Sequence, residues 1–475
     1  MSSFSLPLPR ALAIGVSAVL GMAAVVGAGT LGFVSPGVEA AVSAVVPEPA
    51  VTLEFPAIRP APSTPLAALR FPTCSIQDLV EDTSLGEFQG VVINPSSGVT
   101  AFNREGALGV APASVLKVVT AAAALSALGP DATFSTRVHS TETPGTIALV
   151  GGGDATLSAL DSEGEGVYVG APRLSDLATQ TIAALGAGLA EGQKVAISEL
   201  IVDATLWDPE DSWDSSWSAT ARSRGFVSRV TALQVDGDRE DPRIALSPRS
   251  GNPTKKAAES FVKALKAAGN TSRFVTITYG ASDPDGAVLA SVESRPVVEL
   301  VTYMLKESDN TLAEMLARQV SLEAGFEGSS TSLGEALVSA LAPYAVAETG
   351  VSIRDGSGLS DLNRVSAEYV GGILVEAFRS EGSLGLITEA LSIAGVDGSL
   401  GSRFAGDNAV AHQRVQAKTG SIAGTRSLAG FVQSADGTDL VFAFFAHGDV
   451  GDDARTAIET AVSGIYSCGS NLADF

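Results

Sequence analysis

Apolar residues recur along the chain in runs whose spacing predicts several buried helices and short strands. Between Pro112 and Pro130, Ala, Val and Leu occupy nearly every face of a helix, which is typical of a helix that is buried on all sides. Gly129 and Pro130 would end that helix. Further helices are expected over residues 296–306, 311–323 and 453–466, and strands over residues 415–419, 427–433 and 440–446.

The pattern changes between residues 138 and 285, where Gly, Asp and Ser are frequent and the apolar runs are short. Strand-like runs occur at 147–150, 200–202 and 274–279, and one amphipathic helix is expected over 255–268. We therefore predict one or two inserted domains of mostly β character over residues 138–285. Residues 70–137 and 286–475 would together form an α+β domain, an antiparallel sheet flanked by helices.

The N-terminal residues 1–45 are predicted to be a signal or anchor segment. No charge occurs from residue 11 to residue 34, directly after Arg10. At about 1.5 Å per residue, such a helix could cross a bilayer of about 30 Å. A cleaved signal peptide usually has a shorter apolar stretch and a small-residue cleavage site, for which residues 42–44 are a poor candidate. Export is expected, the length favours an anchor, and cleavage is left open.

Residues 46–69 are predicted to be a semi-rigid linker because they are rich in Pro, which favours extended conformations: Pro47, Pro49, Pro56, Pro60, Pro62 and Pro65. Cys74 and Cys468 then lie near the two ends of the remaining chain. Outside the cytoplasm, two thiols usually form a disulfide. A Cys74–Cys468 bridge would close a very long loop; the alternative is two buried free thiols.

Composition excludes several classes of protein. The 475 residues carry a net charge of −23, and 45% of them are hydrophobic, which is ample for a large core. The excess of acidic residues argues against nucleic-acid binding, which needs clustered cations. With three His and two Cys, a zinc or iron–sulfur site is not expected. We predict no metal and no cofactor.

The candidate chemistry begins at Ser114 and Lys117, at the start of the predicted buried helix. Residues three apart share a helix face, so the hydroxyl and the amine can meet. A neutral Lys amine can act as the base that makes a Ser hydroxyl nucleophilic, and burial would lower the pKa of that amine. The pair Ser260 and Lys263 has the same spacing but is placed mid-helix in a charged segment, where it is interpreted as structural.

Two further motifs follow in order. Ser308-Asp-Asn310 falls between two predicted helices, although Ser250-Gly-Asn252 has the same pattern, and Lys418-Thr419-Gly420 closes a predicted strand. An ordered set of Ser-x-x-Lys, Ser-x-Asn and Lys-Thr-Gly is far more specific than any one of the three. No Gly-x-Ser-x-Gly elbow and no phosphate loop is present, and the three His have no evident nucleophile partner.

With these motifs the chain resembles the penicillin-binding proteins and serine β-lactamases. It is most similar to the D-alanyl-D-alanine carboxypeptidase/endopeptidase family of class C low-molecular-mass penicillin-binding proteins, peptidase family S13. The wide gap between the first two motifs fits that family, which carries inserted domains there. Other segments that carry the resemblance are 150–156, 230–233, 295–300, 310–314, 355–364 and 394–399.

The resemblance implies a site and a mechanism. Ser114 would attack the carbonyl between the two terminal D-alanines of a peptidoglycan stem peptide, with Lys117 as general base. The further roles implied are a proton relay and amide contact from Ser308 and Asn310, positive potential from Lys418, and substrate binding by Thr419, Gly420, Ser421 and Asp154. Backbone N–H groups of Ser114 and Ser421 would form the oxyanion hole. For Asp154 the alternative is a turn-capping role after three glycines.

The partners implied are peptidoglycan stem peptides, β-lactam antibiotics as covalent inhibitors, and a membrane contacted through the N-terminal segment. The expected location is the extracytoplasmic cell envelope. A serine β-lactamase and a penicillin-binding sensor or wall-binding protein without turnover are the alternatives. The sequence leaves open the preference for carboxypeptidase or endopeptidase action, the cross-link type, the oligomeric state and which Arg contacts substrate.

Overall fold

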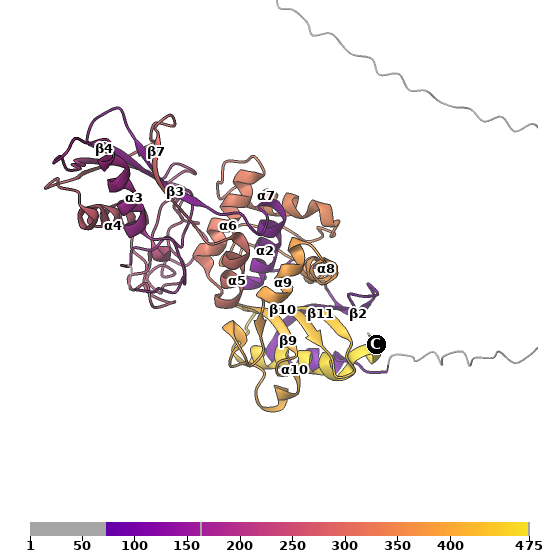
Figure 1. Cartoon of the computed structure of the whole chain (residues 1–475). Coiled ribbons are helices and arrows are strands. Elements are labelled where there is room, and N and C mark those ends of the chain that lie inside the picture. The colour runs from indigo at the N-terminus through magenta and orange to yellow at the C-terminus, as the bar shows by residue number, and fades with distance from the viewer. Residues whose placement is uncertain (1–72, 162–163, 474–475) are drawn as a thin grey trace, which may run out of the picture. The chain divides into compact units, whose positions relative to one another are not determined.

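The computed structural model describes residues 73–161 and 164–473, and it contains two sheets (Figure 1). The larger is antiparallel and has the strand order β2-β1-β11-β10-β9-β8. Its strands are β1 (Glu87–Ile93), β2 (Thr100–Arg104), β8 (Ser392–Ile393), β9 (Val415–Ile422), β10 (Thr425–Gln433) and β11 (Asp439–His447). The three strands predicted near the C-terminal end are therefore confirmed as β9, β10 and β11.

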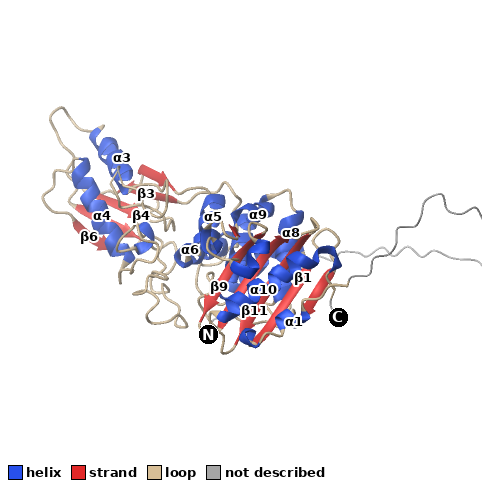
Figure 2. Cartoon of the chain, turned by 90° about the horizontal axis from the view of Figure 1, so that it is seen from below, coloured by secondary structure: helices blue, strands red, loops and turns tan. Residues whose placement is uncertain are grey.

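Helices cover both faces of this sheet, as Figure 2 shows. One face packs against α10 (Asp453–Cys468), which also contacts the short α1 (Gln77–Val80). The other face is covered by α8 (Ala367–Arg379), behind which lie other helices of the large core: α2 (Leu116–Ala127), α5 (Val297–Glu307), α6 (Asn310–Glu323), α7 (Leu333–Leu341) and α9 (Leu386–Ala390).

The alternation of side chains along β11 explains these layers. Phe442 and Phe444 belong to the core shared with α10, whereas Ala443 and Phe445 belong to the core shared with α2 and α8. Successive strand residues point to opposite faces of a sheet, so a strand that is apolar at every position must be covered twice. Full burial of each Phe contributes about 1.5–3 kcal/mol, which makes this strand the centre of the domain.

The buried helix predicted from residue 112 begins with a single 3₁₀ turn, η2 (Ala113–Val115), and continues as α2. Ten residues of α2, from Leu116 to Leu125, are buried, in agreement with its apolar sequence. The other predicted helices are confirmed as α5, α6 and α10.

The smaller sheet lies in the inserted region and is mixed, with the order β6-β5-β4-β3-β7. Strands β4, β5 and β6 run parallel, and β3 pairs antiparallel with β4 and β7. The bounds are β3 (Ser135–Ser140), β4 (Thr146–Val150), β5 (Glu199–Asp203), β6 (Thr276–Tyr279), β7 (Val288–Glu293), α3 (Leu174–Gly186) and α4 (Pro253–Ala268).

Two features of the inserted region differ from the sequence-based expectation. The sheet extends from residue 135 to residue 293, so its edge elements lie partly outside the expected bounds of 138 and 285. In addition, α3 packs beside α4, although only α4 was expected. Parallel strands need a crossover connection, and α3 and α4 supply those between β4 and β5 and between β5 and β6.

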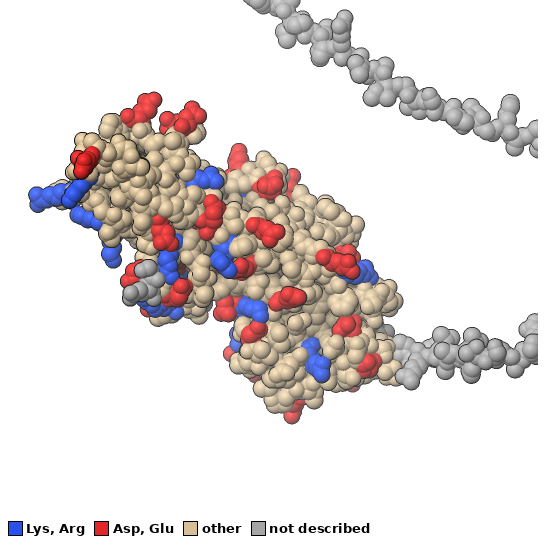
Figure 3. Space-filling model, viewed as in Figure 1, with Lys and Arg blue, Asp and Glu red and all other residues tan. Residues whose placement is uncertain are grey.

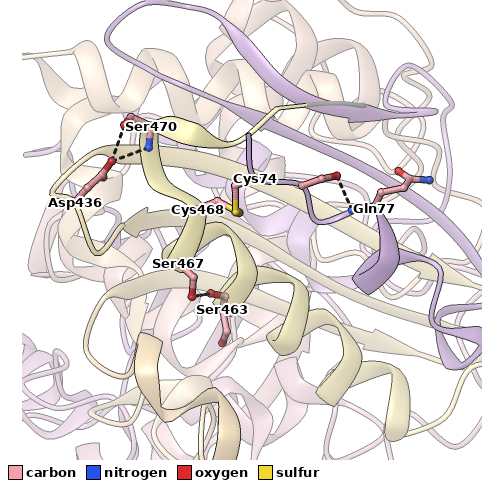
Figure 4. The surroundings of a disulfide bond; sticks show 8 residues. Cys74, Gln77, Asp436, Ser463, Ser467, Cys468 and Ser470 are labelled. Carbon is pink, nitrogen blue, oxygen red and sulfur yellow. Dashed lines mark hydrogen bonds between the residues drawn. A yellow bond between two sulfur atoms is a disulfide. The ribbon is translucent and has the colours of Figure 1, made fainter. Parts of the chain in front are cut away.

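Cys74 and Cys468 form a disulfide that joins the start of the described chain to the end of α10 (Figure 4). Their Cα atoms are 5.4 Å apart although 394 positions separate them in the sequence. The backbone of Cys74 also pairs with Leu472, so hydrogen bonds and the covalent bridge act at the same place.

The predicted anchor and linker lie outside the described residues. Within residues 73–161 and 164–473, no helix is long and apolar enough to cross a membrane. On the face drawn in Figure 3, acidic side chains are interspersed with basic ones, and the basic side chains form no continuous patch.

Candidate active site

The 3₁₀ turn η2 and the first turn of α2 bring Ser114 and Lys117 together. Lys117 Nζ lies 3.0 Å from Ser114 Oγ. Ser114 is half-buried, whereas Lys117 is completely buried. The N–H groups of a first helical turn have no partner within the helix, so the Ser114 N–H is placed where an oxyanion could accept its hydrogen bond.

The Lys117 amine is held by two further acceptors from distant parts of the chain. It donates to Asn310 Oδ1 at 2.6 Å and to the Ser357 carbonyl at 2.6 Å. Burial lowers the pKa of Lys117 to about 8, although the negative charges of Asp355, Glu314 and Asp309 raise it. A substantial fraction of the amine is therefore neutral near pH 8, as a general base requires.

Ser308 lies in the turn between α5 and α6, in the left-handed conformation with φ of 58°. This conformation ends α5 and allows Asn310 to begin α6 directly afterwards. Lys418 Nζ, from β9, donates to Ser308 Oγ at 2.8 Å. Burial and then the positive charge of Lys117 lower the pKa of Lys418 well below its usual value.

Lys418, Thr419, Gly420 and Ser421 follow one another along β9, next to the turn that carries Ser114. Thr419 Oγ1 donates to Ser399 Oγ at 2.9 Å, and Ser421 is exposed. Gly420 is buried against η2: a Cβ at this position would lie 2.9 Å from the Pro112 carbonyl oxygen and 2.1 Å from Ser427 Oγ. The absence of a side chain at Gly420 therefore lets β9 approach the turn that carries Ser114.

A cleft of about 520 Å³ opens onto these residues. Ser114, Ser308, Asn310 and Ser421 line it together with residues of the inserted region and of the 355–364 loop, including Arg224, Phe226 and Asp361. The Ser-x-x-Lys and Ser-x-Asn motifs thus meet at one opening, and Ser421, the residue after Lys-Thr-Gly, lies beside them.

The competing motifs lie elsewhere. Ser260 and Lys263 are in the middle of α4, and Asn252 caps the start of that helix by accepting from Lys255 N–H. None of these residues lines the cleft that contains Ser114.

Asp154 does not line this cleft. It is 2% exposed, and its Oδ1 accepts from Thr156 N–H and Thr156 Oγ1 at 2.7 and 2.6 Å. Burial raises the pKa of Asp154 to about 6, partly offset by the hydrogen bonds from Thr156. An Asp that bonds the backbone two residues ahead caps a turn, so the geometry favours a turn-capping role for Asp154.

Two carboxylates to which sequence reasoning gave no role fix the loop whose carbonyl group bonds to Lys117. Glu314, on α6, accepts from Gly356 N–H and Ser357 N–H at 3.1 and 2.8 Å, and so holds the carbonyl that contacts Lys117. Asp355 accepts from Gly358 N–H and Ser360 N–H and fixes the same loop. Burial and the neighbouring Asp355 raise the pKa of Glu314. Both segments carried the family resemblance, which was the available signal.

Among the described residues, no group of three or more His, Cys, Asp or Glu side chains is arranged to hold a metal ion.

The class of protein that this fold and site define is supported by comparison with known proteins. The model of the D-Ala-D-Ala carboxypeptidase 3 (S13) family matches residues 73–255 and 239–467. Carboxypeptidase DacB of Mycolicibacterium smegmatis is 31% identical over 463 residues, covering 96% of this chain and 97% of that protein. A carboxypeptidase of Mycobacterium tuberculosis is 31% identical over 404 residues, covering 84% of each chain.

The fold is also found among solved structures. The crystal structure of penicillin-binding protein 4 from Haemophilus influenzae matches with a TM-score of 0.68 at 20% identity, covering 82% of this chain and 99% of that one. The same protein complexed with a β-lactam matches with a TM-score of 0.61. The chain belongs to the S13 family of D-Ala-D-Ala carboxypeptidases and is a serine-type hydrolase with the penicillin-binding fold.

Proposed function

We propose that this protein is a D-Ala-D-Ala carboxypeptidase that trims peptidoglycan stem peptides through an acyl-enzyme on Ser114. The observation that carries the proposal is the 3.0 Å contact between the buried Lys117 amine and Oγ of Ser114, which lines the cleft. Lys117 takes the proton of the hydroxyl as Ser114 Oγ bonds to the carbonyl carbon between the two D-alanines. The Ser114 and Ser421 N–H groups receive the negative charge that develops on the carbonyl oxygen.

The second step expels the terminal D-alanine. Its nitrogen needs a proton, and Ser308 stands between the cleft and the Lys418 amine, with which it shares a 2.8 Å hydrogen bond. This position supports the proposal that Ser308 passes a proton to the leaving amine. Asn310 fixes Lys117 through its Oδ1 and extends the row of polar groups along the cleft. Water then hydrolyses the ester on Ser114 and releases the shortened peptide.

Thr419, Gly420 and Ser421 are proposed to hold the terminal carboxylate and the peptide backbone. β9 has the exposed edge residue Ser421 directly after the buried Gly420. A protein of net charge −23 does not attract a carboxylate at long range, so its capture is proposed to rest on short-range hydrogen bonds from these residues.

Two other functions use the same residues. A β-lactamase would need rapid deacylation, and a penicillin-binding sensor would keep the adduct without releasing D-alanine. The D-Ala-D-Ala carboxypeptidase family match and the two carboxypeptidases that are 31% identical favour turnover of peptides. Cleavage of D-alanyl cross-links by the same acyl-enzyme chemistry is the endopeptidase variant of the proposal.

The protein acts outside the cytoplasm, where peptidoglycan is found. We further propose that residues 11–34 anchor it to the cytoplasmic membrane, with residues 46–69 as the linker between the membrane and the folded body. Detergent-dependent extraction of the full chain from cell envelopes, compared with a chain that begins at residue 46, tests this anchor. Equal release of both chains by salt alone would contradict it.

The function is tested with a fluorescent penicillin and a pentapeptide that ends in D-Ala-D-Ala. We expect a persistent adduct on Ser114, identified by mass, and stoichiometric release of D-alanine from the peptide. Ser114→Ala should lose both activities. Ser126→Ala is the matched control, because Ser126 lies on α2 but bonds the Ala340 carbonyl instead of a site residue.

The outcome distinguishes the alternatives. Rapid loss of label with hydrolysed antibiotic would show a β-lactamase, and a stable adduct without D-alanine release would show a sensor. Failure of the wild-type chain to form any adduct on Ser114 would overturn the proposed nucleophile.

A further inference from the structure

The turn that carries Ser308 belongs to the catalytic part of the chain but is held by bonds to the inserted region. Ser308, Asp309 and Asn310 connect α5 and α6 of the catalytic part, yet the side chains of Asp309 and Asn310 are bonded to the inserted region. Asn310 Nδ2 donates to the Phe226 carbonyl at 3.0 Å, which turns Oδ1 of the same amide towards Lys117. The next residue, Thr311, accepts from Ser228 N–H at 3.1 Å.

Asp309 is the charged residue of this turn, and its side chain is buried. One oxygen, Oδ1, caps α6 by accepting from Leu312 N–H at 3.0 Å. The other, Oδ2, accepts from Arg239 Nη2 at 2.6 Å and from the Tyr168 hydroxyl at 2.9 Å. Arg239 and Tyr168 both belong to the inserted region, and the guanidinium lies 4.7 Å from the centre of the Tyr168 ring.

The pair between Arg239 and Asp309 is shielded from water, with side-chain exposures of 2% and 3%. Burial alone would raise the pKa of the Asp309 carboxyl, but the charges of Arg239 and Arg249 and the bond from Leu312 lower it to about 2. Asp309 is therefore ionised at neutral pH, and Arg239 is the counter-charge in direct contact with it. Loss of one partner of a buried pair leaves an uncompensated charge that must move or be solvated.

Arg239 is itself fixed in one orientation. Its Nη1 donates to the Asp236 carbonyl and its Nε to the Ala245 carbonyl, each at 3.1 Å. The planar guanidinium thus aims one nitrogen at Asp309 while the others are held by backbone, an arrangement that a Lys amine cannot reproduce in full.

We propose that Arg239 of the inserted region is a positioning residue for catalysis: its buried ion pair with Asp309 holds the turn so that Ser308 faces Lys418 and Asn310 faces Lys117. The inserted region is then part of the machinery that acylates Ser114, in addition to lining the cleft. This inference rests on the proposed function, since acylation is what it accelerates. A displacement of about 1 Å in a positioned group can lower a rate by about a hundredfold.

The experiment measures the acylation rate of Ser114 by a small penicillin, and kcat and KM for the D-Ala-D-Ala pentapeptide. We expect Arg239→Met to lower both the acylation rate and kcat by about a hundredfold with little change in KM, and Arg239→Lys to recover part of the loss. Adding Asp309→Asn to Arg239→Met removes the unpaired charge and keeps a cap for α6, so the double variant should be acylated faster than Arg239→Met.

Arg403→Met is the matched control for loss of stability. Arg403 is bonded to Glu459 on α10, and this pair contacts none of the catalytic side chains. Arg403→Met should lower the melting temperature but leave the acylation rate of the folded protein unchanged. A purely structural role for Arg239 would give the same result in Arg239→Met.

Three results would overturn the inference. The first is a folded Arg239→Met variant that is acylated within twofold of the wild-type rate. The second is a loss of activity confined to KM for the peptide. The third applies if Arg239→Met fails to fold, and is an Asp309→Asn variant that is acylated at the wild-type rate. By contrast, a wild-type chain that forms no adduct would refute the proposed function itself, so the two failures can be told apart.

Discussion

At the scale of single residues, Lys117 is the group on which the proposed chemistry depends. Replacement by Met keeps the apolar stem but removes the base, and general-base catalysis contributes about 10²–10⁴-fold. We expect Lys117→Met to lower the acylation rate of Ser114 by that factor, measured with a fluorescent penicillin. Lys263→Met is the control, because Lys263 has the same spacing from a Ser but is exposed on α4. Equal losses in both variants would argue against Lys117 as the base.

The same residue predicts the pH dependence. Burial lowers the pKa of Lys117 to about 8, against the opposing charges of Asp355, Glu314 and Asp309. The protonated amine cannot accept the Ser114 proton, so acylation should be slow below pH 7, rise through about pH 8 and level off above it. A stopped-flow pH profile checks this. A rate independent of pH between 6 and 9 would show that another group takes the proton.

At the scale of elements, the loop at residues 355–364 must lie directly against η2. Gly358 has φ of +81°, and a Cβ there would be 1.9 Å from the Ala113 carbonyl oxygen. Gly437, in the turn between β10 and β11, has φ of +85° and open space around it. Gly358→Ala therefore combines backbone strain of about 1–2 kcal/mol with a collision, whereas Gly437→Ala carries the strain alone.

We expect Gly358→Ala to be destabilised by at least 2 kcal/mol more than Gly437→Ala, and to lose most of its acylation rate because the turn that carries Ser114 is displaced. Gly437→Ala should keep the wild-type rate. Denaturant midpoints and the acylation rates of the folded proteins provide the comparison. Similar stability of the two variants would mean that the loop can move away from η2 without cost.

Sequence reasoning predicted the residues with an ordered motif and missed those that act through the backbone or through burial. Ser114, Lys117, Ser308, Asn310 and Lys418 could be predicted because their order along the chain is specific, and the structure brings them together. The Phe226 carbonyl that orients Asn310 leaves no trace in residue type. In the same way, α3 was missed because small and polar residues dilute its pattern, and tertiary packing against α4 supplies its stability.

The partners of Asp309 could not be inferred from sequence for a different reason. Arg239 and Tyr168 precede Asp309 by 70 and 141 positions, and only folding of the inserted region brings them to the catalytic turn. Asp154 shows the converse: the family resemblance implied a substrate contact, but the side chain is buried and bonds to Thr156, its own second neighbour. Local spacing predicts what a residue can do, and long-range packing decides what it contacts.

At the scale of the whole molecule, the disulfide between Cys74 and Cys468 constrains the largest loop in the chain. Removing a native disulfide commonly costs about 2–5 kcal/mol, and longer loops lie at the upper end. Because the unfolding entropy of a chain of this size is large, that loss corresponds to a shift of roughly 3–6 °C in the melting temperature. We expect this shift in the Cys74→Ala/Cys468→Ala variant, and no further effect of reductant on it.

The same variant tests whether the bridge also serves the site. Cys468 is at the end of α10, whereas Arg455 near its start lies 3.4 Å from Ser421 Oγ. These positions are about 20 Å apart along a helix that rises about 1.5 Å per residue. Since α10 is packed along its length on the sheet, loss of the bridge should fray only its last turn, and the acylation rate at 25 °C should stay at the wild-type value. A rate that falls together with the melting temperature would show that the bridge fixes the position of α10 against β9, and that the termini contribute to the geometry around Ser114.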